Sequence, residues 1–600
     1  MPHYSPPIDE VLFTLNEITA YRELTSLSNF KDISEDLTQA VLKEAGKLAS
    51  GPIADINQIG DKKGATLENG SVKTAPGFPE AYKKFVEGGW NGISFPEDIG
   101  GQNMPFALGL SVNEFFTSAN MAFSLCPLLT SGAVEAISAH ASESIKKKYL
   151  SKLVSGEWTG TMNLTEPQAG SDVGSLTTKA IPNSDGSYNI FGTKIYITYG
   201  DHDLAENIIH LVLARTPDSP KGTKGISLFL VPKFFVNDDG VIAEKNDLRC
   251  GSLERKLGIH ASPTAVMLYG ETQGAKGWLI GQENQGMRCM FTMMNHARID
   301  VGVQGLSIAE RAYQQALEYA FSRKQGKSPL VQSDESVSII EHPDVKRMIL
   351  DIKSKIDAMR GLILTTGVYA DLSKYHSNDD SKKLYSELVD LLTPIVKSWC
   401  TDIGFSSAST GLQVHGGMGF IEETGAAQHL RDSRIAPIYE GTNGIQALDL
   451  VFRKLSQSGG KAVDFLFKQI RELISDLNNE DSQDLEIISE LLEKSMDSFK
   501  ISTEWISSKA IKNFNDAASS ASIYLDIFGI LLGSYFLSKA ALKSFNKIKN
   551  QKTNSSFYKN KIQIARFFAE QYLPRVINSP VSVKAGGTAL GSVDFASFGG

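Results

Sequence analysis

The chain has 600 residues, of which 42% are hydrophobic and 21% are charged, and its formal net charge at pH 7 is -8. These shares are ordinary for a soluble globular protein, and the acidic balance argues against a general nucleic-acid binder, because such proteins usually carry excess positive charge. The length is too great for one hydrophobic core and predicts roughly three to five domains or subdomains.

Cysteine usage and the N-terminal residues favour a cytoplasmic location. The four cysteines lie far apart, without metal-ligand or redox spacing, which fits buried thiols in a reducing compartment. They are Cys126, Cys250, Cys289 and Cys400. Pro2, His3 and Pro6 stand where a secretory signal needs basic and apolar residues. The most apolar stretch, 523–537, is interrupted by Asp526 and two glycines, so we expect no membrane span.

The first part of the chain predicts an arm followed by a helical domain. Residues 1–32 are polar and contain prolines, with one short apolar patch around Phe13. From 33 to 157 apolar residues recur at three- and four-residue spacing, which is typical of helices. A cluster of glycines and a proline between Gly88 and Gly101 predicts a loop within this domain.

The middle of the chain predicts a small antiparallel β-domain over residues 158–281. The segments 188–198 and 226–231 are rich in β-branched and aromatic residues, and short stretches of this kind, separated by turn residues, continue to about Ile280.

The remainder predicts helices again. Helical periodicity returns in the segments 285–322, 345–373 and 382–410, within a domain that we place at 282–455. A serine- and glycine-containing linker ends at Gly460, and a further helical domain follows at 461–600. The order of helices, strands, helices and helices indicates segregated layers, so the predicted fold class is α+β and mostly α.

Two common kinds of site are excluded because their sequence fingerprints are missing. The Gly417-Met-Gly419 segment is followed three residues later by Glu422 rather than glycine, so the dinucleotide fingerprint of nicotinamide enzymes is missing. The ten histidines are scattered, without a His-Glu-x-x-His sequence, so we predict no metal site.

The most informative segment is 434–446, which places Glu440 directly before Gly441 and Thr442. Glycine lets the backbone approach a ligand closely, and a carboxylate beside such a loop is a candidate general base. Taken alone, this pattern is more often a turn with an exposed glutamate.

Three further segments, 164–171, 192–198 and 413–420, change that interpretation. In this order and spacing, together with Glu440, they resemble the acyl-CoA dehydrogenase flavoprotein family, from about Gly89 to about Leu450. The ends, 4–17 and 559–574, resemble a long branch of it that includes 3-methylmercaptopropionyl-CoA and broad-range fatty acyl-CoA dehydrogenases. The resemblance implies an N-terminal helical domain, a middle β-domain and a C-terminal four-helix bundle, here with an extra helical domain.

The first two of these segments have chemistry that suits a flavin. Thr165 and Ser171 offer hydroxyls, Gly170 lets the backbone come close, and Tyr196 and Thr198 lie on one face of a strand. The family usually has tryptophan where Tyr196 stands, and Thr198 matches the hydroxyl that bonds the flavin near N5. The FAD contacts that the resemblance implies here are Met162, Leu164, Thr165, Gly170, Ser171, Tyr196 and Thr198.

Other matching positions imply a cofactor shared between subunits. Arg323 and Gln325 follow a predicted helix and match residues that reach the FAD of a neighbouring subunit, and a guanidinium suits a pyrophosphate. Gln413, Gly416 and Gly417 match a glycine-rich helix break that meets the same cofactor. The resemblance therefore implies a homodimer or a larger even homo-oligomer.

The resemblance assigns the chemistry to Glu440, with Arg298 beside it to hold the carboxylate ionised and positioned. Some relatives carry their base directly before this arginine, where this chain has Ala297, which cannot accept a proton. Glu440 is therefore the expected base, and Glu166 is the first alternative. The remaining implied contacts are Thr442 to FAD, and Ser171, Asn295, Arg298, Tyr439 and Gly441 to substrate.

We therefore expect an FAD-dependent acyl-CoA dehydrogenase that converts a saturated acyl-CoA to a trans-2-enoyl-CoA and passes electrons to electron-transfer flavoprotein. Short or medium acyl chains, including 3-methylmercaptopropionyl-CoA, are favoured over long ones. Two alternatives stay open: an acyl-CoA oxidase that uses O2, and a DNA-associated flavoprotein. The second is suggested by eight basic and no acidic residues from Lys539 to Arg566, although a solvated helix face explains them more simply and nucleic-acid binding is not favoured.

Overall fold

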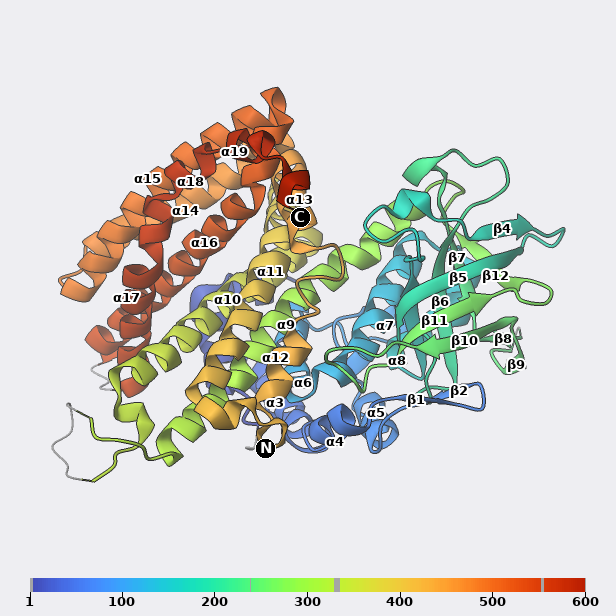
Figure 1. Cartoon of the computed structure of the whole chain (residues 1–600), viewed down its shortest axis with the longest axis horizontal. Coiled ribbons are helices and arrows are strands. Elements are labelled where there is room, and N and C mark those ends of the chain that lie inside the picture. The colour runs from blue at the N-terminus through green and yellow to red at the C-terminus, as the bar shows by residue number, and fades with distance from the viewer. Residues whose placement is uncertain (1–3, 238, 329–334, 552–554, 599–600) are drawn as a thin grey trace.

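The computed structural model describes residues 4–237, 239–328, 335–551 and 555–598. Figure 1 shows a β-domain at one end, long helices through the centre, and the last helices of the chain packed against the centre from the other side. The helices of the first 157 residues lie between and below these parts.

The N-terminal region is helical and largely buried. Its helices are α1 (Ile8–Phe13), α2 (Tyr21–Thr25), α3 (Glu35–Leu48), α4 (Asn57–Lys63), α5 (Phe78–Glu87), α6 (Phe106–Ala119), α7 (Met121–His140) and α8 (Glu143–Ser155), and its one hairpin is β1 (Thr66–Glu68) with β2 (Ser71–Lys73). Side-chain caps begin two of the helices, Ser34 at α3 and Asn120 at α7. The polar arm expected at 1–32 is instead folded from residue 4 onward, with Val11 and Leu15 fully buried.

The β-domain is built on one eight-stranded sheet in the order β10-β11-β5-β12-β7-β6-β3, with β4 beside β5. The strands are β3 (Trp158–Asn163), β4 (Lys179–Pro182), β5 (Tyr188–Thr198), β6 (Asn207–Ala214), β7 (Ser227–Pro232), β8 (Phe234–Val236), β9 (Ile242–Lys245), β10 (Leu248–Leu253), β11 (Thr264–Tyr269) and β12 (Ala275–Ile280). The expectation of a purely antiparallel domain needs one correction, because β3 and β6 pair in parallel. That pairing requires a long crossover, which the β4–β5 hairpin supplies.

Three long helices follow the sheet, and the first and third of them cross at glycines. They are α9 (Gly286–Ser322), α10 (Pro343–Tyr375) and α11 (Asp379–Val414), followed by the short α12 (Ala426–Ser433) and α13 (Asn443–Asp449). A Cβ on Gly404 of α11 would lie 2.5 Å from the carbonyl oxygen of Gly305 on α9, so only glycine allows this approach. The crossing fixes the faces of α9 and α11 that meet the loop before α13.

The last helices cover the outer side of α10 and α11. They are α14 (Lys461–Asn478), α15 (Gln483–Lys512), α16 (Phe514–Gln551), α17 (Ser556–Ile577), α18 (Ser579–Lys584) and α19 (Thr588–Ser592). Trp399 of α11 lies against α16, where a Cβ on Gly529 would come within 2.3 Å of its indole. This contact joins the extra domain to the same helix that supports the candidate site.

Two helices, α7 and the Phe514–Asn550 part of α16, are long and apolar enough to cross a membrane. Neither helix was expected from the sequence to be a candidate membrane span. Within their most apolar windows 78% and 83% of the residues are buried inside the fold, which is the pattern of core helices rather than of lipid-facing ones.

Candidate active site

The loop between α12 and α13 carries Glu440 and closes on itself. The Asn443 N–H donates to the Pro437 carbonyl at 3.1 Å, so the chain turns back across the glutamate. Arg298 Nε on α9 and Gln446 Nε2 on α13 both donate to the Glu440 carbonyl, at 3.3 and 3.4 Å. The structure therefore brings Arg298 and Glu440 together, although they are 142 positions apart in the chain.

Glu440 has a strained backbone. Its φ is 56°, in the left-handed region that non-glycine residues rarely occupy, and such outliers concentrate at functional sites. Gly441 follows with a φ of 83°, and a Cβ there would lie 2.7 Å from Gln446 Nε2. The glycine is thus needed to turn the loop into α13.

The electrostatic surroundings of Glu440 suit a general base. Burial raises the pKa of its carboxyl, while Arg298 and then Lys397 lower it in part. A base whose pKa is raised toward neutral pH is better matched to proton abstraction than an ordinary exposed glutamate. Burial lowers the pKa of Arg298, which is 8% exposed, and Glu440 opposes this effect.

A basic cavity of about 310 Å³ opens beside Arg298. Its lining consists of Arg288, Phe291, Asn295, Arg298, Asp449, Arg453 and Lys454. Asn295 accepts a 3.5 Å hydrogen bond from Arg298, and Arg453 pairs with Asp449 at 3.1 Å. With three arginines and one lysine against a single aspartate, the cavity is suited to a polyanionic ligand.

The predicted flavin loop is tied to β5. Ile195 donates its N–H to the Thr165 carbonyl at 2.9 Å, and the buried Lys194 ammonium donates to the Leu164 carbonyl at 3.0 Å. These bonds hold the loop that follows β3, with Leu164 and Thr165 half-buried, beside the exposed face of β5.

Glu166 belongs to this anchor and is unsuited to act as the alternative base. Its carboxylate pairs with Lys194 at 2.8 Å and accepts further hydrogen bonds from Thr177 and Thr178. Burial alone would raise the pKa of Glu166, but these partners lower it to about 2. A carboxylate so fully bonded and so weakly basic has neither a free lone pair nor the affinity for a substrate proton.

The face of β5 that the loop borders fits a flat aromatic ligand. Tyr196 is 60% exposed and has a φ of 60°, so a large side chain is held out on this surface, with Thr198 two residues along. Gly170 and Ser171 are also exposed, and a Cβ on Gly170 would meet nothing within 4 Å. An uncovered tyrosine, hydroxyls and open backbone match what the isoalloxazine and phosphate parts of FAD require. Met162, by contrast, lies half-buried within β3.

The second group of predicted FAD contacts lies beyond Arg298, at the C-terminal end of α9. Arg323 ends α9, 25 residues after Arg298, which corresponds to about 37 Å along a helix. At that end Tyr319 stacks on His415 at 4.6 Å, which brings Gln413, Gly416 and Gly417 alongside. Arg323 and Gln413 are exposed, and the Arg323 guanidinium contacts Gln325 at 3.2 Å.

Two predicted contacts have other partners in this structure. The Tyr439 hydroxyl bonds to the buried Gln304, so it points into the bundle. The Thr442 hydroxyl accepts from the Ile445 N–H at 3.3 Å and caps α13. Their substrate and FAD roles therefore stay predictions, with a local structural role seen for each.

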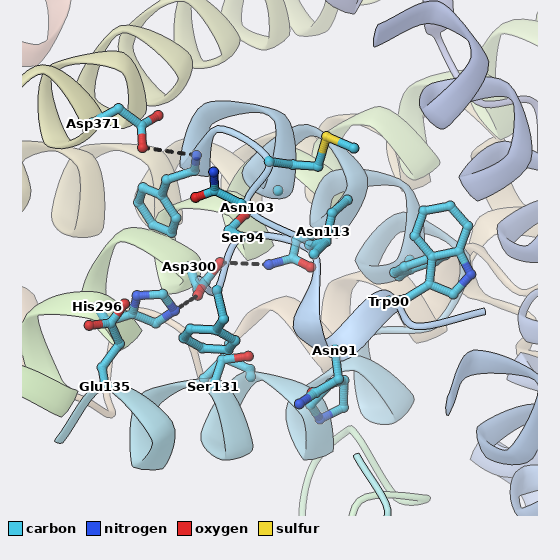
Figure 2. Close-up of a pocket in the computed structure, with 18 of the residues that line it drawn as sticks. Trp90, Asn91, Ser94, Asn103, Asn113, Ser131, Glu135, His296, Asp300 and Asp371 are labelled. Atoms are coloured by element: carbon cyan, nitrogen blue, oxygen red, sulfur yellow. Dashed lines mark hydrogen bonds and ion pairs between the residues drawn. The ribbon is translucent and has the colours of Figure 1, made fainter. Parts of the chain in front are cut away.

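A separate pocket, shown in Figure 2, lies on another face of α9. Asp300 in it accepts from Asn113 at 3.2 Å and lies 3.4 Å from His296 Nε2. At about 100° per residue, Arg298 points away from the side shared by His296 and Asp300. The cavity volume is about 60 Å³, enough for a few waters, and none of the predicted site residues lines it.

Sequence reasoning missed Lys397 and Gln446 near the glutamate. Lys397 is fully buried on α11 and its charge influences Glu440. A signal was present, because Lys397 interrupts an apolar run between Leu391 and Trp399. A lone lysine in such a run is rarely buried without a partner.

Comparison with known proteins decides the family. The chain matches the families Acyl-CoA dehydrogenase, N-terminal domain (62–157), middle domain (161–270) and C-terminal domain (284–455), and then Acetyl-CoA dehydrogenase C-terminal like (466–594). A 3-methylmercaptopropionyl-CoA dehydrogenase of Ruegeria pomeroyi is 42% identical over 95% of this chain and 96% of its own. The chain belongs to the acyl-CoA dehydrogenase family.

Acyl-CoA dehydrogenases are FAD-dependent oxidoreductases, and this chain is one of them. A butyryl-CoA dehydrogenase of Syntrophomonas wolfei is 34% identical over 98% of both chains. A crystal structure of an acyl-CoA dehydrogenase with FAD from Bacillus anthracis superposes with a TM-score of 0.70 at 22% identity, covering 94% of this chain and 90% of that one. This last likeness shows that the fold is shared over nearly the whole length.

Proposed function

We propose that this acyl-CoA dehydrogenase oxidises a saturated acyl-CoA to the trans-2-enoyl-CoA with Glu440 as its base. The observation that carries the proposal is the placement of Glu440. A carboxylate with a raised pKa stands on a strained loop beside Arg298, next to a basic cavity. FAD, when bound, supplies the acceptor for the hydride that leaves the β-carbon.

The residues of this chain handle the proton and the charge. Glu440 takes the proton from the α-carbon, and the hydride leaves from the β-carbon. One C–H bond therefore breaks at each of these adjacent carbons, and a double bond forms between them. The thioester oxygen gains negative charge in that step and needs a hydrogen-bond donor. The Glu440 N–H has no partner among the residues that the structure describes, and it can serve as that donor.

The basic cavity explains recognition of CoA. Coenzyme A carries several phosphate charges, and guanidinium groups bind phosphates through paired hydrogen bonds. Arg288, Arg298 and Arg453 line the cavity together, within reach of the Glu440 loop. These cations are proposed to bind the phosphate end of CoA, and the arm between the phosphates and the thioester would reach from there to the base.

We propose short or medium acyl groups, including 3-methylmercaptopropionyl-CoA, as substrates. The basis is similarity along the full length to enzymes named for 3-methylmercaptopropionyl-CoA and for butyryl-CoA. A panel of acyl-CoAs of increasing length, assayed with an artificial electron acceptor, tests this. Highest kcat/KM on the 3-methylmercaptopropionyl or butyryl thioester supports it, whereas a clear preference for long chains contradicts it.

Electron-transfer flavoprotein is the proposed acceptor. An oxidase would instead release hydrogen peroxide at a rate matching substrate consumption, so measuring peroxide in air-saturated buffer separates the two. We expect peroxide to be a minor product.

A second copy of the chain is proposed to complete each FAD site. Arg323 lies about 37 Å from Arg298 along α9, and both Arg323 and Gln413 are exposed. Large apolar side chains are exposed around them, with Phe420 at 83% and Phe321 at 60%. Exposed aromatic residues at a predicted cofactor edge favour burial against a partner.

Ion pairs within the fold use part of the basic stretch of the last domain. Four of its charges are paired within the chain, at Lys547, Lys549, Lys561 and Arg566. These pairs favour a structural role for the stretch over nucleic-acid binding.

A further inference from the structure

Lys397 is a fully buried cation close to the active-site loop. It lies on α11, and its Nζ donates to Asn443 Oδ1 at 2.9 Å. An ammonium has three protons to donate, and within the described residues Asn443 is its one hydrogen-bond acceptor. Burying a lysine costs free energy unless a nearby charge or a function offsets it.

Asn443 joins this lysine to the loop of Glu440. It is the first residue of α13, and its backbone N–H closes the loop on Pro437. Its side-chain amide donates to the Ser398 carbonyl at 3.1 Å and to Asp402 Oδ1 at 2.9 Å, both on α11. These hydrogen bonds attach the loop to one turn of α11, and Lys397 makes one of them.

Charges from several elements surround this cluster. Arg298 on α9 acts on both Glu440 and Lys397, and Asp402 on α11 acts on Lys397. Asp449 on α13 and Arg453 after α13 act on Arg298 in turn. Tyr439 lies beside the glutamate and is influenced by it. Lys397 and Arg298 are the two cations that oppose the effect of burial on Glu440.

We propose that Lys397 is a positioning residue, which holds the Glu440 loop through Asn443 and supplies a buried positive charge that favours the ionised base. This rests on the proposed role of Glu440. Lys397 touches neither substrate nor FAD, and it acts through the glutamate.

The pKa shifts of Lys397 and Glu440 are consistent with a favourable interaction between their charges. Burial lowers the pKa of Lys397 to about 7, while Glu440 and Asp402 raise it and Arg298 lowers it. The ionised glutamate and the ammonium therefore stabilise each other. Without Lys397 the pKa of Glu440 would rise further, and the carboxylate that acts as base would be present only at higher pH.

The test is the pH profile of kcat/KM for the FAD-loaded Lys397→Met enzyme. Methionine has a similar length and no charge, so packing is largely kept. The acid limb should move to higher pH, and the rate near neutral pH should fall by roughly tenfold, which corresponds to about 1.4 kcal/mol. Lys355→Met is the matched control, because Lys355 is also buried but pairs with Asp351 on α10 at 2.7 Å. The acid limb of kcat/KM in this control variant should stay at the wild-type pH.

Asn443→Ala provides a second, independent variant. This substitution removes the side-chain hydrogen bonds that hold the loop on α11 and keeps the lysine. The plateau of kcat/KM should therefore fall, while the acid limb should move less than in Lys397→Met. A folded Lys397→Met enzyme with the wild-type profile overturns the proposal. If that variant does not fold, a wild-type plateau in Asn443→Ala overturns it instead. Loss of turnover in Glu440→Gln alongside either result would leave the base assignment intact, so the two failures are distinguishable.

Discussion

At the scale of single residues, the protonation state of Glu440 is set by opposing effects. Burial raises the pKa of the carboxyl, and Arg298 is the stronger of the two cations that lower it. A general base works only when deprotonated, so activity should rise with pH through this pKa. Anything that removes a neighbouring positive charge should shift that rise to higher pH.

Arg298→Ala should therefore move the acid limb of kcat/KM upward, and further than Lys397→Met. The arginine also lines the basic cavity, so KM for acyl-CoA should rise as well. The measurement is steady-state kinetics across pH with an artificial acceptor. An unchanged limb in a folded, FAD-containing variant would show that Arg298 does not tune the base.

At the scale of elements, a buried charge network fastens the first helix to the last domain. Lys561 on α17 bonds to the Glu10 carboxylate on α1 and to Asp357 on α10 at 2.8 Å, and Lys353 bonds to the same two acids. Burial would raise the pKa of Glu10, but Lys353 and Lys561 hold it well below its usual range. The resulting stabilisation is present at neutral pH and is lost as acidification passes through that lowered pKa.

Lys561→Met should lower the free energy of unfolding by about 3 kcal/mol, because it removes a buried cation that Glu10 and Asp357 share and leaves them only Lys353 and Arg360. Urea unfolding at neutral pH measures this. Lys559→Met, two positions earlier and exposed, should change stability by no more than about 0.5 kcal/mol. Equal effects of the two substitutions would show that the network contributes nothing specific.

Periodicity and composition located most elements, but not those whose stability comes from distant contacts. The segment 188–198 coincides with β5, because its β-branched and aromatic residues are a local signal. The N-terminal arm contains prolines and one short apolar patch, and its residues 14–18 and 21–25 are helical where they pack on α10 and α16. Glu440 could be found from its motif, whereas Lys397 depends on how α11 meets the loop, which the sequence alone does not specify.

At the scale of the whole molecule, the length of α9 separates residues that the proposed function assigns to two different FAD sites. Arg298, which binds the Glu440 loop, lies in the first half of this helix, and Arg323 with the glycine-rich turn at Gly416–Phe420 stands at its C-terminal end. A second chain, related by twofold symmetry, would place each far end at its partner's flavin loop. FAD retention and assembly should therefore be linked.

Phe420→Asp should weaken assembly and reduce FAD retention together, because it places a charge on the exposed apolar surface of the far end. Light scattering coupled to gel filtration gives the mass, and the flavin absorbance gives the FAD content. Ile511→Asp changes an equally exposed side chain, 85% accessible, at the end of α15 and should leave both unchanged. A monomeric Phe420→Asp enzyme with full FAD would contradict the shared site.

The most direct test of the account is flavin bleaching by acyl-CoA under anaerobic single-turnover conditions in Glu440→Gln. The amide keeps the size of the side chain but cannot accept the α-proton at neutral pH, while the loop bonds to the Glu440 carbonyl remain available. FAD content and acyl-CoA binding should be normal, and the bleaching rate should fall by roughly 100- to 10,000-fold. Bleaching at close to the wild-type rate would contradict the assignment of Glu440 as the base.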